Sequence, residues 1–261
     1  MTGSSRKWRT GNAIRTSERT TTGALAYEVR GSGPPLILLH GLSGSGRWWG
    51  RNVPVFARSF RTYTVDLPGF GQSRHLRWSR LDDIVDRIAD WLADEDLPRV
   101  HIAGHSLGGA VAARLAAHHP DHVNRLVLVD AAIRLRGTRA TARPEDLVQT
   151  IRRATPGFAP LLLRDLLRCR PQSFISATVD AMQTDWESHL ARISAPTLVV
   201  WGEHDAITPL ALGHEIVAVV PGARLITVPG AGHNPMLERA DAFNAAVLRF
   251  LTDETSQASN A

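Results

Sequence analysis

The chain has few of the residues on which several classes of protein depend. It contains one cysteine in 261 residues, so no internal disulfide can form. Lys7 is the only lysine, and the net charge of +5 comes from arginines that are scattered along the sequence. Aromatic residues make up 6% of the chain, so no stacking platform accompanies this charge. We therefore expect no nucleic acid among its partners.

Long apolar runs are also missing. No segment has the length and hydropathy needed to cross a bilayer, and the basic residues 6–9 lead into no apolar segment of the kind that a signal peptide contains. The sequence thus favours a soluble protein of the cytoplasm with no membrane partner. It gives no indication of an oligomeric state.

The hydrophobic fraction of 43% over 261 residues is enough for one large domain. Short apolar runs rich in β-branched residues and leucine alternate with segments of helical periodicity. This alternation predicts an α/β fold with a doubly wound, mostly parallel, eight-stranded sheet flanked by helices. Strands are expected at residues 24–30, 36–40, 60–66, 100–103, 125–130, 197–201 and 223–228, and helices at 48–57, 81–94, 110–118, 210–220 and 235–251.

One segment interrupts the alternation. Residues 131–194 contain no convincing strand but three helix-like stretches, which begin near Pro144, Phe158 and Pro171. We interpret this segment as a helical cap inserted into the core, because ligands of open α/β sheets bind at the carboxyl ends of the strands. The expected division is residues 1–130 and 195–252 for the core, 131–194 for the cap and 253–261 for a disordered tail.

The sequence Gly104-His105-Ser106-Leu107-Gly108-Gly109 has the pattern G-x-S-x-G between an apolar strand and an alanine-rich helix. So tight a strand-to-helix turn strains the backbone of its central residue and exposes the Ser106 hydroxyl. The helix that starts there directs amides toward an oxygen beside the serine. The motif predicts a nucleophile for acyl transfer, with His105 packed inside the turn.

A serine nucleophile needs a base and an acid that orients it. His233 lies in a glycine-rich loop after the last expected strand, and Asp205 follows the strand at 197–201. Both lie at carboxyl ends of strands, as Ser106 does, and the order Ser106, Asp205, His233 is the order used by this architecture. Asp130, at the end of the strand at 125–130, is an alternative acid.

The chain resembles the α/β-hydrolase superfamily from about residue 24 to residue 251. The motifs that carry the resemblance are His40-Gly41, Asp66-Leu67-Pro68-Gly69-Phe70-Gly71, the Ser106 turn, Trp201-Gly202-Glu203-His204-Asp205 and Gly232-His233. The resemblance implies that Ser106 attacks, His233 transfers the proton and Asp205 orients the imidazole. It also implies an oxyanion hole formed by the amides of Leu42 and Leu107, without a cofactor or a metal.

Several reactions occur on this fold. The serine at the turn excludes the aspartate nucleophile of haloalkane dehalogenases and epoxide hydrolases, and the two tyrosines, Tyr27 and Tyr63, lie in expected core strands rather than in the cap. Carbon–carbon bond hydrolases commonly have tryptophan after the histidine, where this chain has Asn234. Thioesterases, lactonases and perhydrolases share the triad with esterases, and a receptor with slow turnover stays open as an alternative.

Apolar residues in the expected cap suggest the substrate. Phe158, Phe174, Ile175, Val179 and Met182 either line a pocket or seal the cap against the core. The first alternative favours a small, mainly apolar substrate. We therefore expect hydrolysis of a carboxylic ester or lactone of this kind through an acyl-enzyme on Ser106.

Overall fold

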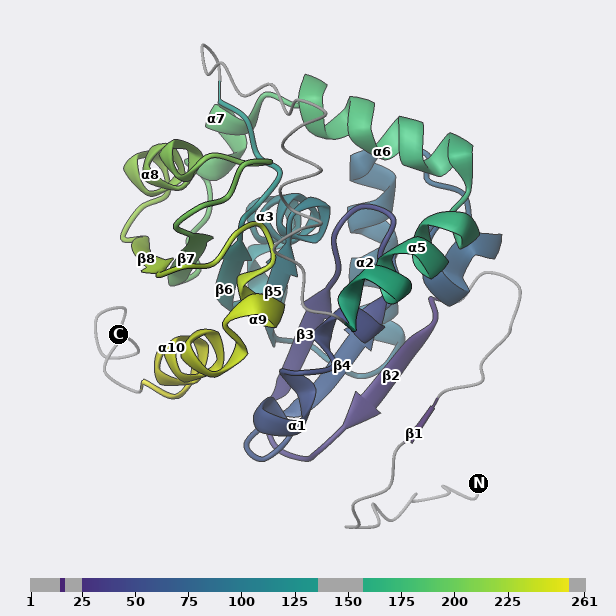
Figure 1. The fold of residues 1–261 in the computed structure, drawn as a ribbon, viewed down its shortest axis with the longest axis horizontal. Helices are drawn as coiled ribbons and strands as arrows, with labels where there is room; N and C mark the ends of the chain where they lie inside the picture. Colours follow the sequence, from purple (N-terminus) through teal and green to yellow (C-terminus); the bar gives the residue numbers. More distant parts are fainter. Residues whose placement is uncertain (1–14, 17–24, 136–156, 254–261) are drawn as a thin grey trace, which may run out of the picture.

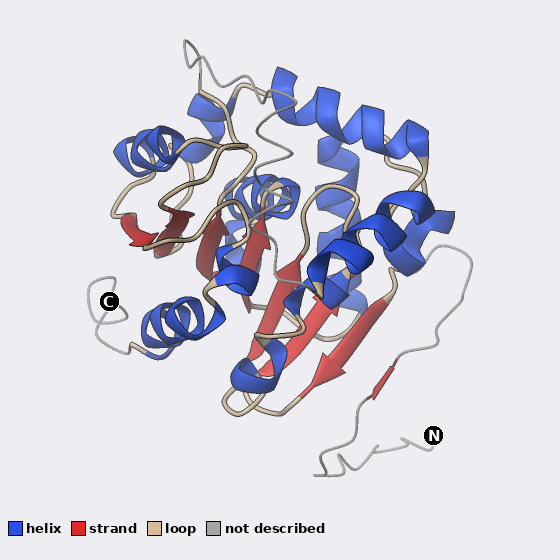
Figure 2. Cartoon of the chain, viewed as in Figure 1, coloured by secondary structure: helices blue, strands red, loops and turns tan. Residues whose placement is uncertain are grey.

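A computed structural model of the chain describes residues 15–16, 25–135 and 157–253. It contains an eight-stranded sheet with the spatial order β1-β2-β4-β3-β5-β6-β7-β8 (Figures 1 and 2). The β1–β2 and β2–β4 pairs are antiparallel, and the other five pairs are parallel. The strands are β1 (Arg15–Thr16), β2 (Tyr27–Arg30), β3 (Pro35–Leu39), β4 (Arg61–Val65), β5 (Val100–His105), β6 (Val123–Val129), β7 (Thr197–Gly202) and β8 (Arg224–Val228).

The expected fold is confirmed, and the strands from β2 to β8 match the seven apolar runs in the sequence. The eighth strand, β1, has two residues and pairs with Glu28 and Val29 of β2. A two-residue strand has no sequence pattern of its own, since only its hydrogen bonds to a neighbour define it.

The apolar runs form strands because both faces of the parallel sheet are covered. On β3, Ile37 and Leu39 belong to one buried cluster, and Leu36 and Leu38 belong to another. This alternation follows from the two-residue period of a strand. Each strand therefore supplies side chains to two separate cores.

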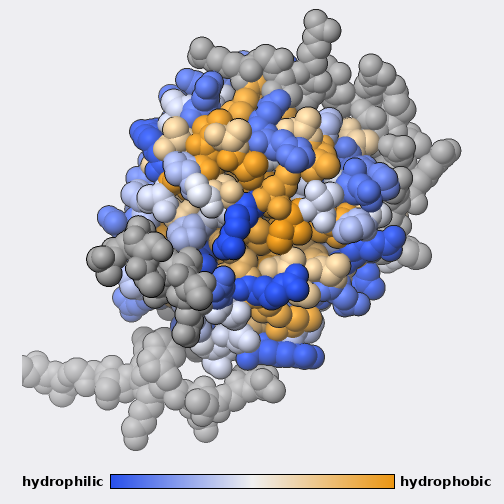
Figure 3. All heavy atoms as spheres, turned by 90° about the vertical axis from the view of Figure 1, so that its left-hand side faces the viewer, coloured by the Kyte–Doolittle hydropathy of each residue, from blue (hydrophilic) through white to orange (hydrophobic). Residues whose placement is uncertain are grey.

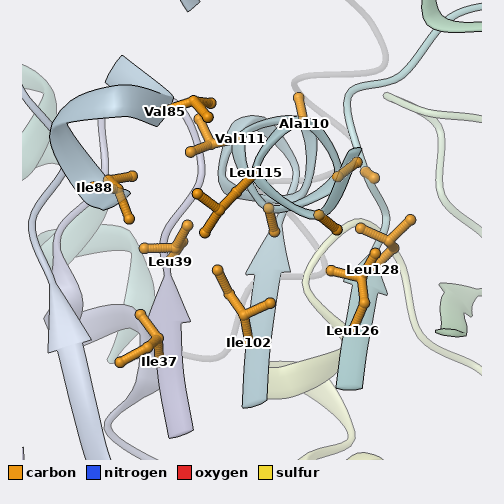
Figure 4. Packing of buried hydrophobic residues seen from close by; sticks show 14 of the residues in the cluster. Ile37, Leu39, Val85, Ile88, Ile102, Ala110, Val111, Leu115, Leu126 and Leu128 are labelled. Carbon is orange, nitrogen blue, oxygen red and sulfur yellow. The ribbon is translucent and has the colours of Figure 1, made fainter. Parts of the chain in front are cut away.

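The first core lies between the sheet and helices α2 (Leu81–Asp94) and α3 (Leu107–His118). Helix α8 (Leu210–Val219) extends this layer. Figure 4 shows helix side chains packed onto those of the strands, among them Val85 and Ile88 of α2, Val111 and Leu115 of α3, Ile37 of β3, Ile102 of β5 and Leu126 of β6. The second core lies on the opposite face, under α1 (Val53–Phe56) and α10 (Ala240–Thr252).

Two expected helices are divided in the structure. The helix expected at residues 48–57 is a 3-10 turn, Gly46–Trp49, followed by the single turn of α1. The helix expected at 235–251 is split into α9 (Pro235–Glu238) and α10 by Arg239, whose φ of −133° and ψ of 50° are not helical. Periodicity continues through both breaks, so the sequence pattern alone does not reveal them.

Three helices are described between β6 and β7. They are α5 (Phe158–Arg168), α6 (Pro171–Gln183) and α7 (Trp186–Leu190). Figure 1 shows α5 and α6 on the side toward which the central parallel strands point. The helix expected from Pro144 lies outside the described residues, as does the tail beyond Asp253. The division into core and cap stays a prediction.

The sheet ends at β8, which is half-buried along most of its length. Figure 3 views the molecule from the side of β8, α8 and α10, and shows apolar residues gathered across the middle of this face with hydrophilic residues around them. Among the helices in the described part of the chain, none combines the length and hydropathy needed to cross a bilayer.

Candidate active site

Ser106 occupies a strained turn between β5 and α3. Its φ of 51° and ψ of −114° lie in a region that residues other than glycine rarely adopt. The surrounding backbone fixes this conformation, because the Ser106 amide donates to the Val129 carbonyl at 2.9 Å and the Ser106 carbonyl accepts from the Ala132 amide at 2.9 Å.

The glycines of the motif make the turn sterically possible. A Cβ atom on Gly104 would lie 2.1 Å from the Gly108 carbonyl oxygen, and a Cβ atom on Gly108 would lie 2.5 Å from the carbonyl oxygen of Leu39. The strand, the turn and the start of α3 therefore approach one another as closely as their backbones allow. The geometry matches the turn expected from the sequence.

His233 and Asp205 are joined directly. His233 Nδ1 donates to Asp205 Oδ2 at 2.8 Å, and both side chains are buried. His233 lies in the loop before α9, and Asp205 lies in the loop after β7, so the carboxyl ends of two strands bring them together. With its Nδ1 protonated, neutral His233 has Nε2 free to accept a proton.

Asp205 accepts three further hydrogen bonds. The Thr208 hydroxyl donates to Oδ2 at 2.5 Å, and the amides of Ile207 and Thr208 donate to Oδ1 at 2.8 and 3.0 Å. Burial alone would raise the pKa of Asp205, but the charge of His233 and the hydrogen bonds outweigh burial and lower the pKa to about 2. Asp205 is therefore ionised at neutral pH.

Asp130 lies close to Asp205 but takes no part in its hydrogen bonds. Asp130 is fully buried, its Oδ1 accepts the Gly202 amide at 2.9 Å, and its Oδ2 has no hydrogen-bond partner in the described part of the chain. Burial and the neighbouring charge of Asp205 raise the pKa of Asp130 well above its ordinary range, the opposite direction to Asp205. His233 Nδ1 bonds Asp205 Oδ2, so Asp205 is the acid that orients the imidazole in this structure.

Asp130, Asp205 and His233 also have the spacing of metal ligands, with one donor atom from each within 4.8 Å of the others. However, four donors already use both oxygens of Asp205, and a metal ion would have to displace them. We interpret the group as a hydrogen-bond network, consistent with the expectation of no metal.

His105 connects the Ser106 turn to the His233 loop. Its Nε2 donates to the His233 carbonyl at 2.7 Å, and the two imidazole rings lie 4.9 Å apart between centroids. Burial and the charge of His233 lower the pKa of His105 to about 3, so the ring is neutral. As expected, His105 packs inside the turn, and it also holds the backbone of His233.

The loop after β3, residues 41–46, lies against Ser106. A Cβ atom on Gly41 would lie 3.3 Å from Ser106 Cβ, so the loop backbone passes directly beside the serine. His40 shapes the start of this loop, because its Nδ1 donates to the Gly41 carbonyl at 2.8 Å and its Nε2 accepts the Leu67 amide at 2.9 Å. Leu42 follows Gly41, and Leu107 is the first residue of α3, so both expected oxyanion donors are adjacent to Ser106 in space or in sequence.

Sequence reasoning missed two polar residues. Thr208 joins the Asp205 network, and its position three residues after Asp205 was a usable signal. Asp165 of α5 bonds Ser45 and Trp48, more than 110 residues away in sequence, and no local pattern indicates such a contact.

The apolar residues of the expected cap divide into two groups. Phe158 is buried against Trp48, with ring centroids 5.1 Å apart. Ile175, Val179 and Met182, which we expected either to line a pocket or to seal the cap, are exposed at 62%, 41% and 61%. Because α6 turns these three side chains toward solvent, they neither seal the segment against the core nor enclose a pocket in this structure, and Phe174 is half-buried.

The chain belongs to the alpha/beta hydrolase family, whose model matches residues 36–246. The match includes the Ser106 turn, Asp205 and His233. The sheet order, the strained serine and the Asp205–His233 pair are features of this class of enzyme.

Two relatives of known name are similar to this chain over most of their length. The chain is 31% identical to pimeloyl-[acyl-carrier protein] methyl ester esterase of Nitrosomonas europaea, over 84% of this chain and 96% of that protein. It is 29% identical to 2-hydroxy-6-oxononadienedioate/2-hydroxy-6-oxononatrienedioate hydrolase of Cupriavidus pinatubonensis, over 83% and 86%. The crystal structure of the enol-lactonase from Burkholderia xenovorans superposes with a TM-score of 0.77 at 24% identity, covering 88% of this chain and 96% of that one, a likeness that shows the fold.

Proposed function

We propose that this enzyme hydrolyses a carboxylic ester or lactone of a small, mainly apolar substrate through an acyl-enzyme on Ser106. The observation that carries the proposal is the 2.8 Å bond between His233 Nδ1 and ionised Asp205, in a site whose serine has the strained backbone of a nucleophile. The relative named as a methyl ester esterase supports an ester with a small alcohol.

In the proposed reaction, Ser106 Oγ attacks the carbonyl carbon while His233 Nε2 takes the hydroxyl proton. The amides of Leu42 and Leu107 stabilise the negative oxygen of the tetrahedral intermediate. His233 then returns the proton to the leaving alcohol, and the acyl group stays on Ser106. A water molecule, deprotonated by His233, attacks the acyl carbon, and the bond from that carbon to Ser106 Oγ then breaks. His233 returns the proton to Ser106 Oγ, which releases the acid and restores the enzyme.

Ser106→Ala and His233→Ala test this mechanism. Each variant should lose hydrolysis while keeping the melting temperature of the native protein, because nucleophile and base act as a unit. A fluorophosphonate probe should label the native enzyme and not the Ser106→Ala variant. Retention of more than about 1% of the native kcat/KM in Ser106→Ala would refute the acyl-enzyme, since loss of a triad serine costs orders of magnitude.

The substrate class needs a panel of compounds. Methyl and p-nitrophenyl esters of acids of increasing length, lactones, thioesters and peptide amides should rank with short to medium esters or lactones first. A preference for peptides or long-chain triglycerides would contradict the proposed class of small, mainly apolar esters and lactones.

Carbon–carbon bond hydrolysis is the second candidate, because one relative is named as a hydrolase of 2-hydroxy-6-oxo dienoates. Asn234 after His233 departs from the tryptophan common in such enzymes. Turnover of a 2-hydroxy-6-oxo dienoate with a kcat/KM above that of every ester in the panel would favour this candidate.

A further inference from the structure

Helix α5 buries an aspartate and exposes leucines. Asp165 is 2% exposed, whereas Leu163 and Leu167 are 57% and 78% exposed. Burying a carboxylate is far less favourable than burying a leucine unless the carboxylate is hydrogen-bonded. The orientation of α5 therefore requires specific donors for Asp165.

One donor, Ser45, belongs to the oxyanion loop, residues 41–46, and the other, Trp48, lies in the 3-10 turn that follows this loop. Asp165 Oδ2 accepts the Ser45 hydroxyl at 2.7 Å and the Trp48 indole N–H at 3.1 Å. Phe158 of the same helix packs edge-on against the Trp48 ring. Helix α5 is thus fastened to the end of the oxyanion loop by one charged side chain and one aromatic side chain.

The oxyanion loop needs external support. Ser43 has a φ of 60°, in the left-handed region that residues other than glycine rarely adopt. Gly44 cannot be replaced by a residue with a side chain without a clash, because a Cβ atom there would lie 2.9 Å from the Trp48 indole. Strained backbone of this kind persists where surrounding contacts fix it.

Three side chains fix this loop. His40 holds the Gly41 carbonyl at one end, and Asp66 accepts the Gly46 amide at 2.6 Å at the other. Asp165 holds Ser45. His40 and Asp66 come from the ends of β3 and β4, whereas Asp165 comes from the segment between β6 and β7.

We propose that Asp165 is a positioning residue for the oxyanion loop, which couples the docking of α5 to the placement of the Leu42 amide beside Ser106. The inference rests on the proposed function, because it concerns the oxyanion hole of that reaction. When α5 is docked, Ser45 and Trp48 are held and the loop has its third support. When α5 moves away, the loop keeps His40 and Asp66 alone and stabilises the oxyanion less.

Asp165→Asn and Ser45→Ala test the coupling from its two sides. Both donors bond Oδ2, and the amide oxygen of Asp165→Asn can take that position, but without the carboxylate charge it accepts the two hydrogen bonds more weakly. We therefore expect kcat to fall roughly three- to tenfold with KM within about twofold, less than the loss for removing an oxyanion donor itself. Ser45→Ala should lower kcat in the same direction, and the double variant should fall by less than the product of the two single effects, because both changes act on the same hydrogen bond. Melting temperatures identify any variant that is unfolded.

A trifluoromethyl ketone gives a readout that a merely structural role would not change. This inhibitor forms an oxyanion adduct with the serine, so its affinity should fall by the same factor as kcat in Asp165→Asn. The corresponding methyl ketone, which binds without a stable adduct, should bind native enzyme and variant equally.

Asp180→Asn is the matched control. Asp180 Oδ2 accepts the Trp78 indole N–H at 2.7 Å, so it fastens α6 to the core through the same pair of groups but away from the oxyanion loop. This variant should keep the native kcat and the native affinity for the trifluoromethyl ketone.

Two results would overturn the inference. The first is a native kcat and a native inhibitor affinity in folded Asp165→Asn. The second is an equal loss of kcat and inhibitor affinity in Asp180→Asn, which would mean that general docking of the helices, and not the bond to Ser45, controls these two quantities. If Asp165→Asn does not fold, Ser45→Ala and Trp48→Phe decide by the same readouts, and native values in both refute the coupling. Loss of activity in Ser106→Ala together with native behaviour in Asp165→Asn would refute this inference alone, whereas an active Ser106→Ala would refute the proposed function.

Discussion

Replacing Asp205 with asparagine should reverse the hydrogen bond to His233. Oδ1 of Asp205 faces two backbone amides, those of Ile207 and Thr208, and both need an acceptor. The single oxygen of the new amide will therefore take the Oδ1 position, and its NH2 group will take the Oδ2 position. There it donates to His233 Nδ1, which moves the ring proton to Nε2 and leaves no acceptor for the Ser106 proton.

The expected loss in kcat is about 10⁴-fold, the effect of the same change on the same triad in serine proteases, or about 5 kcal/mol in the activation barrier. Unfolding of the Asp205→Asn variant would not account for a loss of about 10⁴-fold in kcat. The shift in the pKa of Asp205 from 3.8 to about 2 in the folded protein corresponds to about 2 kcal/mol of stability, which a marginally stable domain can lose and stay folded.

The assay is kcat and KM on a p-nitrophenyl ester, with unfolding in urea measured beside it. Asp130→Asn is the matched control, because the oxygen of the new amide can still accept the Gly202 amide, and the bond between His233 and Asp205 does not involve Asp130. This control should stay within about tenfold of native kcat, since it keeps the His233 tautomer. A larger loss in Asp130→Asn than in Asp205→Asn would make Asp130 the acid that orients His233.

Three further predictions concern stability. Because the folded pKa of Asp205 lies below the unfolded value, its contribution of about 2 kcal/mol to stability is complete above pH 3.8 and is lost as the pH falls toward 2. Urea unfolding should show this loss of stability in the native protein and not in Asp205→Asn. Asp130 has the opposite sign, because its folded pKa is raised and its contribution to stability falls as the pH rises above 3.8. Asp130→Asn should therefore be more stable than the native protein at pH 7, and equal or lower stability would contradict the raised pKa. Gly104→Ala should lower the free energy of unfolding by about 3 kcal/mol or more, because its Cβ atom would overlap the Gly108 carbonyl. Gly157→Ala has open space around its Cβ atom and should change the melting temperature little. Similar melting temperatures for the two variants would refute the steric argument.

The strands and the main helices could be predicted from the sequence because local patterns determine them. Helix α2 coincides with the predicted residues 81–94, since seven of its residues form one buried face at helical spacing. The Ser106 turn was predictable because glycines at fixed spacing are required by backbone contacts within a few residues. Asp205 and His233 were predictable from their positions after two strands and from the order of the three residues in the chain, and the structure brings these two side chains together.

The remaining features depend on contacts between distant residues. Nothing near Asp165 indicates that it is buried, because its partners Ser45 and Trp48 lie 120 and 117 positions away. The raised pKa of Asp130 depends likewise on burial in the folded protein and on Asp205, which lies near it because β6 pairs with β7. Hydropathy periodicity describes which face of a helix is apolar, and it does not describe which polar side chain finds a partner there.

The segment between β6 and β7 leaves the sheet after Val129 and returns at Thr197, which pairs with Leu126 on the adjacent parallel strand. The sheet fixes both ends of the segment, so doubling its length would add only about 0.6 kcal/mol of closure entropy. Substitution of this whole segment by that of a relative is therefore a practical route to enzymes with altered substrate range, because Ser106, Asp205 and His233 all lie outside it. A grafted segment would need an acceptor at the position of Asp165, and grafts chosen by this criterion should retain more activity than grafts chosen by sequence identity.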